Sequence, residues 1–386
     1  MFAIASFVLA FGPPWVLYIW LLRSFPGAAR HRGTVLAALG AFVVVQPLTY
    51  LLVVRVHWAP AQGVHFVLIL IAVTIAMATP CLAVLAATSW AFGARARKRS
   101  GAAPEAPKSV RRRQIVEATV GTALLGVTGG ALGWGILRGR HDYRLVEVPI
   151  RIPGLPSALD GYVIAQISDI HTGEYVGERE FGEGLTLVHR ARPDLIVVTG
   201  DIVDFDASYT PLAARRIADL PARDGVFACL GNHDHYAGAG AVAAALRAAG
   251  IEPLVNAGRV IRPGDGGGFA LLGVDDLASL RRGGRGPDLR LALAGVPSAL
   301  PRILLSHQPP TVDGWAGQVA LQLSGHTHGG QINPGGVVTS PLFEYVAGLY
   351  AVRGTSLYVN RGFGTVGPPA RIGVPPEVTR IVLVAA

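Results

Sequence analysis

Five short polar clusters carry side chains that can hold metal ions. They are ISDIHTG at 167–173, TGDIVD at 199–204, LGNHDHY at 230–236, LSHQPP at 305–310 and SGHTHGG at 324–330. Together they offer seven candidate ligands: Asp169, His171, Asp201, Asn232, His307, His326 and His328. Oxygen and imidazole ligands without a cysteine suit Mn, Fe or Zn in a catalytic role rather than a structural zinc site. We therefore expect a site for two divalent metal ions that hydrolyses a phosphoester.

The chemistry explains why these residue types occur together. A phosphoester is anionic and repels hydroxide, whereas two cations about 3.5–4 Å apart neutralise it and lower the pKa of a bound water that attacks as hydroxide. Asp201 follows Gly200, so its carboxylate can approach closely enough to bridge both ions. The leaving alkoxide needs a proton, and we expect His233 to supply it as general acid, with Asp204 orienting the imidazole.

Spacing within and between the clusters supports a shared site. Asp169 and His171 stand two residues apart, as do His326 and His328, so each pair leaves one face of an extended segment. A single D-x-H or H-x-H is common, and an isolated Asn232 is typical of a turn. Five clusters in order, each after a strand-like run, favour the metal site. We also expect a set of neighbouring residues to line its pocket: Thr172, Gly173, Tyr236, Gln331 and Asn333.

The elements that must position these clusters are strands alternating with helices. The strand candidates are VIAQIS, LIVVTG, VFACLG, FALLGV, RILLSH and VALQLSG, and helical patterns cover 177–192, 210–220 and 240–250. The 32 residues from Asp169 to Asp201 and the 31 from Asp201 to Asn232 match the roughly 30 residues of one βαβ unit. The pattern predicts an α/β fold with a largely parallel sheet, whose carboxyl edge gathers the ligands.

Charge and hydrophobicity divide the chain of 386 residues, 51% of them hydrophobic, into two domains. Fourteen Lys and Arg face two acidic residues up to Arg140, a net of +12, and the rest carries −3 of the formal +9. The basic excess therefore belongs to an apolar membrane domain at 1–140. The domain at 141–386 is mildly acidic, which argues against a nucleic-acid partner.

Four uncharged apolar stretches are long enough to cross a bilayer, at 2–22, 34–54, 66–93 and 118–137. The first and third loops are basic, with a linker at 94–114 rich in Lys and Arg, whereas the second loop carries only Arg55. The positive-inside rule places those two loops in the cytoplasm. We therefore expect a multi-pass plasma-membrane protein whose catalytic domain is extracytoplasmic. The run at 109–126 can be read as a twin-arginine export signal around Arg111–Arg113 or as a basic helix flank.

The set SDIH, GDIVD, GNHD, SHQP and GHTHGG resembles the calcineurin-like metallophosphoesterases. The tail at 357–383 resembles bacterial phosphohydrolases that carry N-terminal membrane helices or an export signal. The resemblance implies a four-layer α/β/β/α sandwich with two mixed sheets. It assigns Asp201 to both ions and His233 to the protonation of the leaving group, with Asp204 behind it. Its remaining ligands form two sets: Asp169, His171 and His328 on one ion, and Asn232, His307 and His326 on the other.

The expected function is a membrane-anchored phosphohydrolase, in the first place a phosphodiesterase for lipid-linked or envelope-linked phosphoesters. One alternative is a pyrophosphatase of UDP-sugar lipids, whose nucleotides would require a cytoplasmic site. Another is a membrane scaffold that binds metals or phospho-ligands without cleaving them. A channel is disfavoured because the four predicted spans contain no Asp, Glu, Lys or Arg. Metal identity, natural substrate and oligomeric state are left open.

Overall fold

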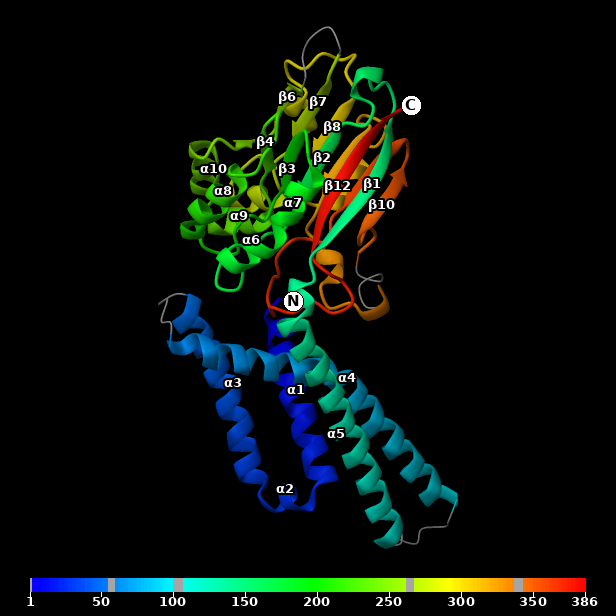
Figure 1. Cartoon of the computed structure of the whole chain (residues 1–386). Coiled ribbons are helices and arrows are strands. Elements are labelled where there is room, and N and C mark those ends of the chain that lie inside the picture. The colour runs from blue at the N-terminus through cyan, green and yellow to red at the C-terminus, as the bar shows by residue number, and fades with distance from the viewer. Residues whose placement is uncertain (1, 55–59, 100–106, 262–266, 337–342) are drawn as a thin grey trace. The chain divides into compact units, whose positions relative to one another are not determined.

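The computed structural model describes residues 2–54, 60–99, 107–261, 267–336 and 343–386 (Figure 1). The chain forms two compact units, Met1–Gly133 and Trp134–Ala386. The first unit is helical and the second contains both sheets. Five long or connecting helices precede the sheets: α1 (Phe2–Ser24), α2 (Pro26–Arg30), α3 (Arg32–Val54), α4 (Pro60–Arg99) and α5 (Pro107–Leu137).

Three stretches among the residues searched are long and apolar enough to cross a membrane: Arg32–Val53, Val64–Ala91 and Arg111–His141. They confirm three of the four predicted spans. The fourth, at 2–22, is not supported. The helix α1 runs over Phe2–Ser24, but only residues 12–24 of it have described side chains. The remainder of that predicted span lies outside the described residues.

Glu117 links three of these helices. It is 4% exposed and accepts a hydrogen bond from Ser89 of α4. Arg23 of α1 lies 3.9 Å from its carboxylate and Arg113 of α5 lies 3.8 Å from it. The Trp20 indole donates to the Glu117 carbonyl at 3.1 Å. The span predicted to begin at residue 118 did not include this glutamate, whereas the apolar stretch Arg111–His141 does. The two arginines and the serine compensate its buried charge.

The second unit contains two six-stranded sheets. In spatial order the first consists of β1 (Arg144–Ile152), β12 (Glu377–Ala385), β2 (Val163–Ile167), β3 (Leu195–Thr199), β4 (Val226–Cys229) and β5 (Glu252–Pro253). The second consists of β10 (Gly348–Val352), β11 (Thr355–Val359), β9 (Leu321–Ser324), β8 (Arg302–Leu305), β7 (Phe269–Gly273) and β6 (Ala257–Ile261). All six strands predicted from the sequence are present.

Seven of the ten strand pairings among the described residues are parallel, as periodicity predicted, but both sheets also contain antiparallel pairs and are therefore mixed, as the resemblance implied. Strands β2 to β5 are parallel, but β12 lies between β1 and β2, parallel to β1 and antiparallel to β2. In the second sheet the edge strands β6 and β10 are antiparallel to their neighbours. Hydrophobic periodicity reports burial and not strand direction, so it could not show how the last strand inserts.

The central strands β2, β3, β7, β8 and β9 form these sheets because their side chains are buried on both faces along nearly their whole length. One core cluster, including Ile164, Val197, Leu271, Ile303 and Leu323, fills the space between the sheets. Five helices lie along the first sheet (Figure 1): α6 (Glu178–Gly184), α7 (Thr186–Ala191), α8 (Thr210–Ala218), α9 (Asn232–Ala237) and α10 (Ala239–Ala248). The predicted helix at 177–192 is thus two helices. The far face of the second sheet is covered in part by α11 (Leu289–Ala292). Trp315 of α12 (Val312–Trp315) packs against the same apolar cluster.

Candidate metal centre

The seven candidate ligands lie on five loops that follow the carboxyl ends of parallel strands. The loops after β2, β3 and β4 carry Asp169 with His171, Asp201 and Asn232, and those after β8 and β9 carry His307 and the pair His326 and His328. The two sheets meet at this edge, because the backbone N–H of His326 donates to both carboxylate oxygens of Asp169, at 2.9 and 3.0 Å. The structure therefore brings all five loops together.

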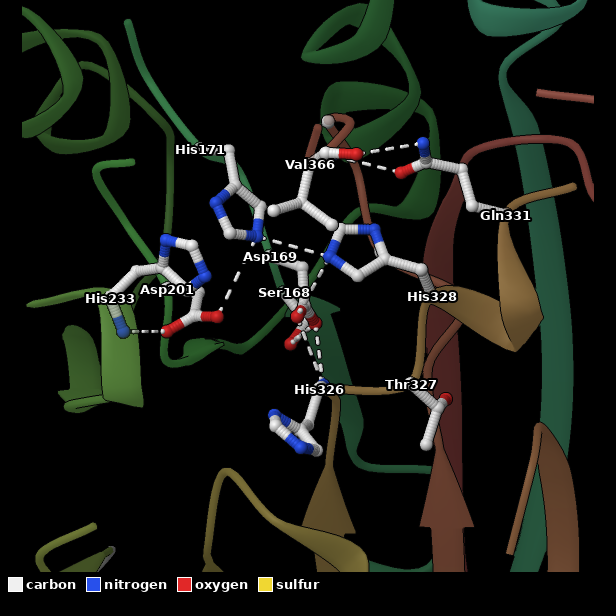
Figure 2. Close-up of polar contacts among 12 residues, drawn as sticks. Ser168, Asp169, His171, Asp201, His233, His326, Thr327, His328, Gln331 and Val366 are labelled. Carbon is white, nitrogen blue, oxygen red and sulfur yellow. Dashed lines mark hydrogen bonds and ion pairs between the residues drawn. The ribbon is translucent and has the colours of Figure 1, made fainter. Parts of the chain in front are cut away.

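Asp169, His171 and His328 form a first group of donors. Figure 2 shows the two imidazoles facing each other, with their Nε2 atoms 3.0 Å apart. Oδ1 of Asp169 lies 3.4 Å from Nε2 of His328. One ligand atom from each of the three residues lies within 4.8 Å of the others, and all three side chains are buried. Three lone pairs converging in this way fit one divalent ion.

Asn232, His307 and His326 form a second group. Nε2 of His307 lies 3.2 Å from Oδ1 of Asn232 and 3.3 Å from Nδ1 of His326. Nδ1 of His307 bonds to the carbonyl of Thr199 at 2.8 Å, which turns Nε2 toward the shared centre. A carboxylate, an amide oxygen and imidazoles without a thiolate suit Mn, Fe or Zn, so the donor chemistry fits a dinuclear centre.

Asp201 lies between the two groups. Its Oδ2 is 3.6 Å from Nε2 of His171 and 3.2 Å from Nε2 of His307, one imidazole from each group. Its Oδ1 accepts the backbone N–H of His233 at 2.8 Å, which fixes the carboxylate plane (Figure 2). One oxygen facing both groups is the arrangement that a bridging ligand requires.

The ligand loops are strained, and this strain was not visible in the sequence. Five of the seven candidate ligands have left-handed backbone angles: φ is 52° at Asp169, 51° at His171, 52° at Asp201, 73° at His326 and 51° at His328. Side chains other than glycine rarely adopt this region, at a cost of about 1–3 kcal/mol each. The surrounding hydrogen bonds must hold these conformations in place, which preorganises the donors before any ion binds.

Glycines permit the close approach of these loops. A Cβ placed on Gly231 would lie 2.2 Å from Oδ1 of Asp201, and one on Gly325 would lie 2.1 Å from Oδ2 of Asp169. Both contacts are far shorter than a van der Waals distance. The motifs GNHD and GHTHGG therefore need their first glycine because a ligand carboxylate occupies the space of its side chain.

The buried charges favour the binding forms of Asp201, His326 and His328, whereas the pKa of His307 is raised well above its usual value because Asp201 outweighs the effect of burial. Burial alone would raise the pKa of Asp201, but His307 and His171 hold it well below its usual range. The pKa of His328 is well below its usual value because of burial, His171 and Arg371. Burial and His307 likewise lower the pKa of His326. Ionised carboxylate and neutral imidazole are the forms that coordinate a metal.

The ring of His233 is held by both the main chain and the carboxylate of Asp204. Its Nδ1 bonds to the backbone carbonyl of Asp204 at 2.9 Å, and the Asp204 carboxylate oxygen Oδ1 lies 3.1 Å away. That same oxygen is 3.4 Å from Nδ1 of His171. Only the carbonyl contact meets hydrogen-bond geometry, so main chain and carboxylate orient the ring together. This leaves Nε2 of His233 as the nitrogen able to reach a substrate.

Asp234 also organises the site, and sequence reasoning missed it. The fully buried carboxylate accepts the backbone N–H groups of Ile202, Val203 and Gly231, at 2.9, 3.2 and 2.9 Å. It thereby ties the loop after β3 to the loop after β4. Burial and Asp201 raise the pKa of Asp234 to about 6. Its position in GNHD was the available signal, but no pattern in the sequence shows which backbone groups a carboxylate accepts.

Arg371 is a second residue that the sequence did not reveal. It is 1% exposed and donates to the carbonyls of Arg361, Gly362 and Gly364. Its Nη2 lies 3.3 Å from Nδ1 of His328. Burial lowers the pKa of Arg371 to about 10. The guanidinium therefore holds the loop after β11 next to His328 and favours the neutral form of that imidazole.

The five residues expected to line the pocket have different roles. Thr172 is fully buried, and Asn333 donates to the carbonyl of Gly329. Gln331 binds Val366 in both directions, as Figure 2 shows, so it fixes a loop. Gly173 lies against Asp204. Only Tyr236 presents an exposed ring beside His233, with centroids 5.3 Å apart.

Comparisons with known proteins show which family the chain resembles. The family described as calcineurin-like phosphoesterase matches residues 162–330. A zebrafish (Danio rerio) transmembrane protein with a metallophosphoesterase domain is 36% identical over 74% of this chain and 66% of its own. The metallophosphoesterase YkuE of Bacillus subtilis is 32% identical over 70% of this chain and 97% of its own. A metallophosphoesterase of Aquifex aeolicus is 33% identical over 62% of this chain and 91% of its own.

The match to the vertebrate relatives is partial. This chain spans 66% of the length of the zebrafish protein and 60% of that of a bovine (Bos taurus) transmembrane protein with the same kind of domain. The two bacterial relatives are matched over nearly their whole length.

Proposed function

The chain belongs to the calcineurin-like metallophosphoesterase family, and from this premise we propose that it is a membrane-anchored, metal-dependent phosphodiesterase. The observation that carries the proposal is Asp201, whose Oδ2 faces an imidazole of each donor group at 3.6 and 3.2 Å. A site built around one shared oxygen suits two ions acting on one phosphate. Mn, Fe or Zn would each fit its ligands.

Each residue of the site then has a role. Asp169, His171 and His328 would hold one ion, and the other would be held by Asn232, His307 and His326, with Asp201 shared between them. Two such ions supply charge neutralisation of the phosphate and an activated water nucleophile. His233 donates a proton from Nε2 to the departing alkoxide, while Asp204 holds Nδ1.

We propose a lipid-linked or envelope-linked phosphoester as substrate. Three candidate membrane spans on the same chain support a substrate that resides in or near a bilayer. The basic loops predict a catalytic unit on the extracytoplasmic side. A reporter enzyme that works only outside the cytoplasm should therefore be active when it is fused to the C-terminus. One that works only in the cytoplasm should be inactive there. A cytoplasmic result would favour the alternative, a pyrophosphatase of UDP-sugar lipids.

The direct test is hydrolysis of bis-p-nitrophenyl phosphate by the purified full chain with Mn²⁺, Fe²⁺ or Zn²⁺. We expect turnover that chelation abolishes and that Asp201→Ala reduces strongly, whereas His233→Ala reduces it much less, because a weakly basic nitrophenolate needs little help from a proton donor. His189→Ala is the matched control, because this histidine of α7 is exposed and lies outside the site. No turnover with any of these ions, or equal turnover in all variants, would favour instead a scaffold that binds phospho-ligands without cleaving them.

A further inference from the structure

Four large apolar side chains on the loop after β3, on α9 and on the neighbouring 3-10 helix are exposed to solvent. Phe205 is 47% exposed, Tyr236 39%, Leu277 42% and Leu280 54%. We call these four residues the apolar ledge. Scattered exposed hydrophobic residues are ordinary on a protein surface, but a contiguous apolar group next to a site marks a binding surface.

Ring contacts show that the ledge begins at His233 itself. The Phe205 ring lies 4.7 Å from the His233 ring and the Tyr236 ring lies 5.3 Å from it, centroid to centroid. Phe205 and Tyr236 are nearly parallel, at 10°, with centroids 6.2 Å apart. Both aromatic rings therefore pack against the His233 ring, and both are themselves exposed to solvent.

The two leucines continue the ledge from a neighbouring element. They lie on the 3-10 helix η4 (Leu277–Arg282), which packs against α9. Arg282 at the end of η4 donates to the backbone carbonyl of Tyr236 at 3.3 Å. Asp275, two residues before η4, bonds to Nε2 of His235 at 2.8 Å. These contacts hold η4 beside the aromatic pair.

We propose that the apolar ledge binds the hydrocarbon part of the leaving group, so that the substrate is a phosphoester of a lipid-type alcohol. This rests on the proposed function, in which His233 protonates the leaving oxygen. A proton donor must come within about 2.6–3.2 Å of the atom it protonates. The group attached to that oxygen must therefore lie next to the residues that flank His233.

Geometry favours a flexible hydrocarbon over a planar base. A ring held between Phe205 and Tyr236 would need two contacts of about 3.5 Å each, or roughly 7 Å, and the centroids are only 6.2 Å apart. Leucines contribute aliphatic surface rather than stacking planes. Exposed arginines border them, at Arg281, Arg282 and Arg285, which complements the anionic headgroups of an amphiphile.

The test uses the full chain and methyl aryl phosphodiesters whose phenol carries a para-alkyl chain of one, four or eight carbons. The chain length changes hydrophobic contact while the chemistry of the leaving oxygen stays nearly constant. We expect kcat/KM to rise about tenfold or more from one to eight carbons below the micelle concentration. The double variant Leu277→Ser with Leu280→Ser should reduce that ratio to about twofold, mainly through KM.

Leu349→Ser is the matched control, since Leu349 is 50% exposed on β10, at the far edge of the second sheet from β6 and β7. Its ratio should equal that of the wild type. A wild-type rate independent of chain length, or a double variant that keeps the wild-type ratio, would overturn the ledge while leaving the phosphodiesterase intact. Absence of turnover with the one-carbon ester would overturn the proposed function and this inference together.

Discussion

Gly231→Ala tests the packing of the metal site with a single methyl group. Gly231 has φ −107°, which alanine adopts without strain, so backbone conformation does not complicate the substitution. The added Cβ would lie 2.2 Å from Oδ1 of Asp201 and 2.5 Å from its backbone nitrogen, whereas ordinary contact begins at 3.4 Å. The shared carboxylate or its loop must therefore move by about 1.2 Å, the difference between 3.4 and 2.2 Å.

A displacement of about 1 Å at a catalytic site can reduce the rate about 100-fold, which corresponds to roughly 2.7 kcal/mol of transition-state stabilisation. We expect kcat/KM to fall by about that factor and the bound metal to fall below two ions per chain, measured by steady-state kinetics and inductively coupled plasma mass spectrometry. Gly240→Ala is the control, because no atom lies within 4 Å of its Cβ position in α10. That variant should keep full activity and gain up to about 1 kcal/mol of helix stability.

The reasoning would be refuted if Gly231→Ala retained two ions and a kcat/KM within about threefold of the wild type. Such a result would mean that Asp201 does not lie against the Gly231 backbone in the working enzyme. Loss of activity in both glycine variants would also refute it, since one position is crowded and the other is open.

Three further predictions concern the surroundings of the site. His233→Asn should slow esters of alkyl alcohols about 100-fold or more but nitrophenyl esters far less, because only a basic leaving oxygen needs a proton; equal losses in kcat would exclude a proton-donor role. Arg371→Met should leave several buried carbonyls without a donor and lower the free energy of unfolding by about 3 kcal/mol or more. The measurements are the unfolding temperature and the affinity for metal, both of which should fall, and a variant as stable as the wild type would contradict this. Burial opposes the charged form of His235, but the contact with Asp275 raises the pKa of this histidine above the usual 6.5. The stability that the pair adds is therefore fully present below pH 6.5 and is lost as the pH rises through the pKa of the folded state. In EDTA, His235→Gln should flatten that decline in unfolding temperature, and an unchanged pH profile would argue against the pair.

The polar clusters could be predicted from sequence because each lies directly after an apolar strand. Asp169, Asp201 and Asn232 follow β2, β3 and β4, and parallel strands bring their carboxyl ends to one edge. The resemblance added that the strands form two mixed sheets, whereas His307, His326 and His328 were predicted from the polar clusters themselves. The same reasoning did not include the last strand, β12, and it counted a span at 2–22 that is not among the three candidate spans of the described residues.

The residues that support the site could not be predicted in this way. Asp234, Arg371 and Phe205 act through contacts with backbone groups or rings from other segments. Those contacts depend on where loops cross, and the sequence between the loops contains no signal for the crossing. A buried arginine and a fully buried aspartate in the printed sequence look like ordinary surface charges.

The types of the ligands, their order and the alternation of strands with helices followed from the amino-acid sequence, because coordination chemistry and side-chain periodicity are local properties. The distance from one carboxylate oxygen to two imidazoles, the left-handed backbone of five ligands and the apolar ledge beside His233 were decided only by the tertiary structure. They depend on the relative placement of segments far apart in the chain, such as those of Asp169 and His326, which are 157 residues apart. Such placement arises when the sheets pack face to face, and no single segment contains it.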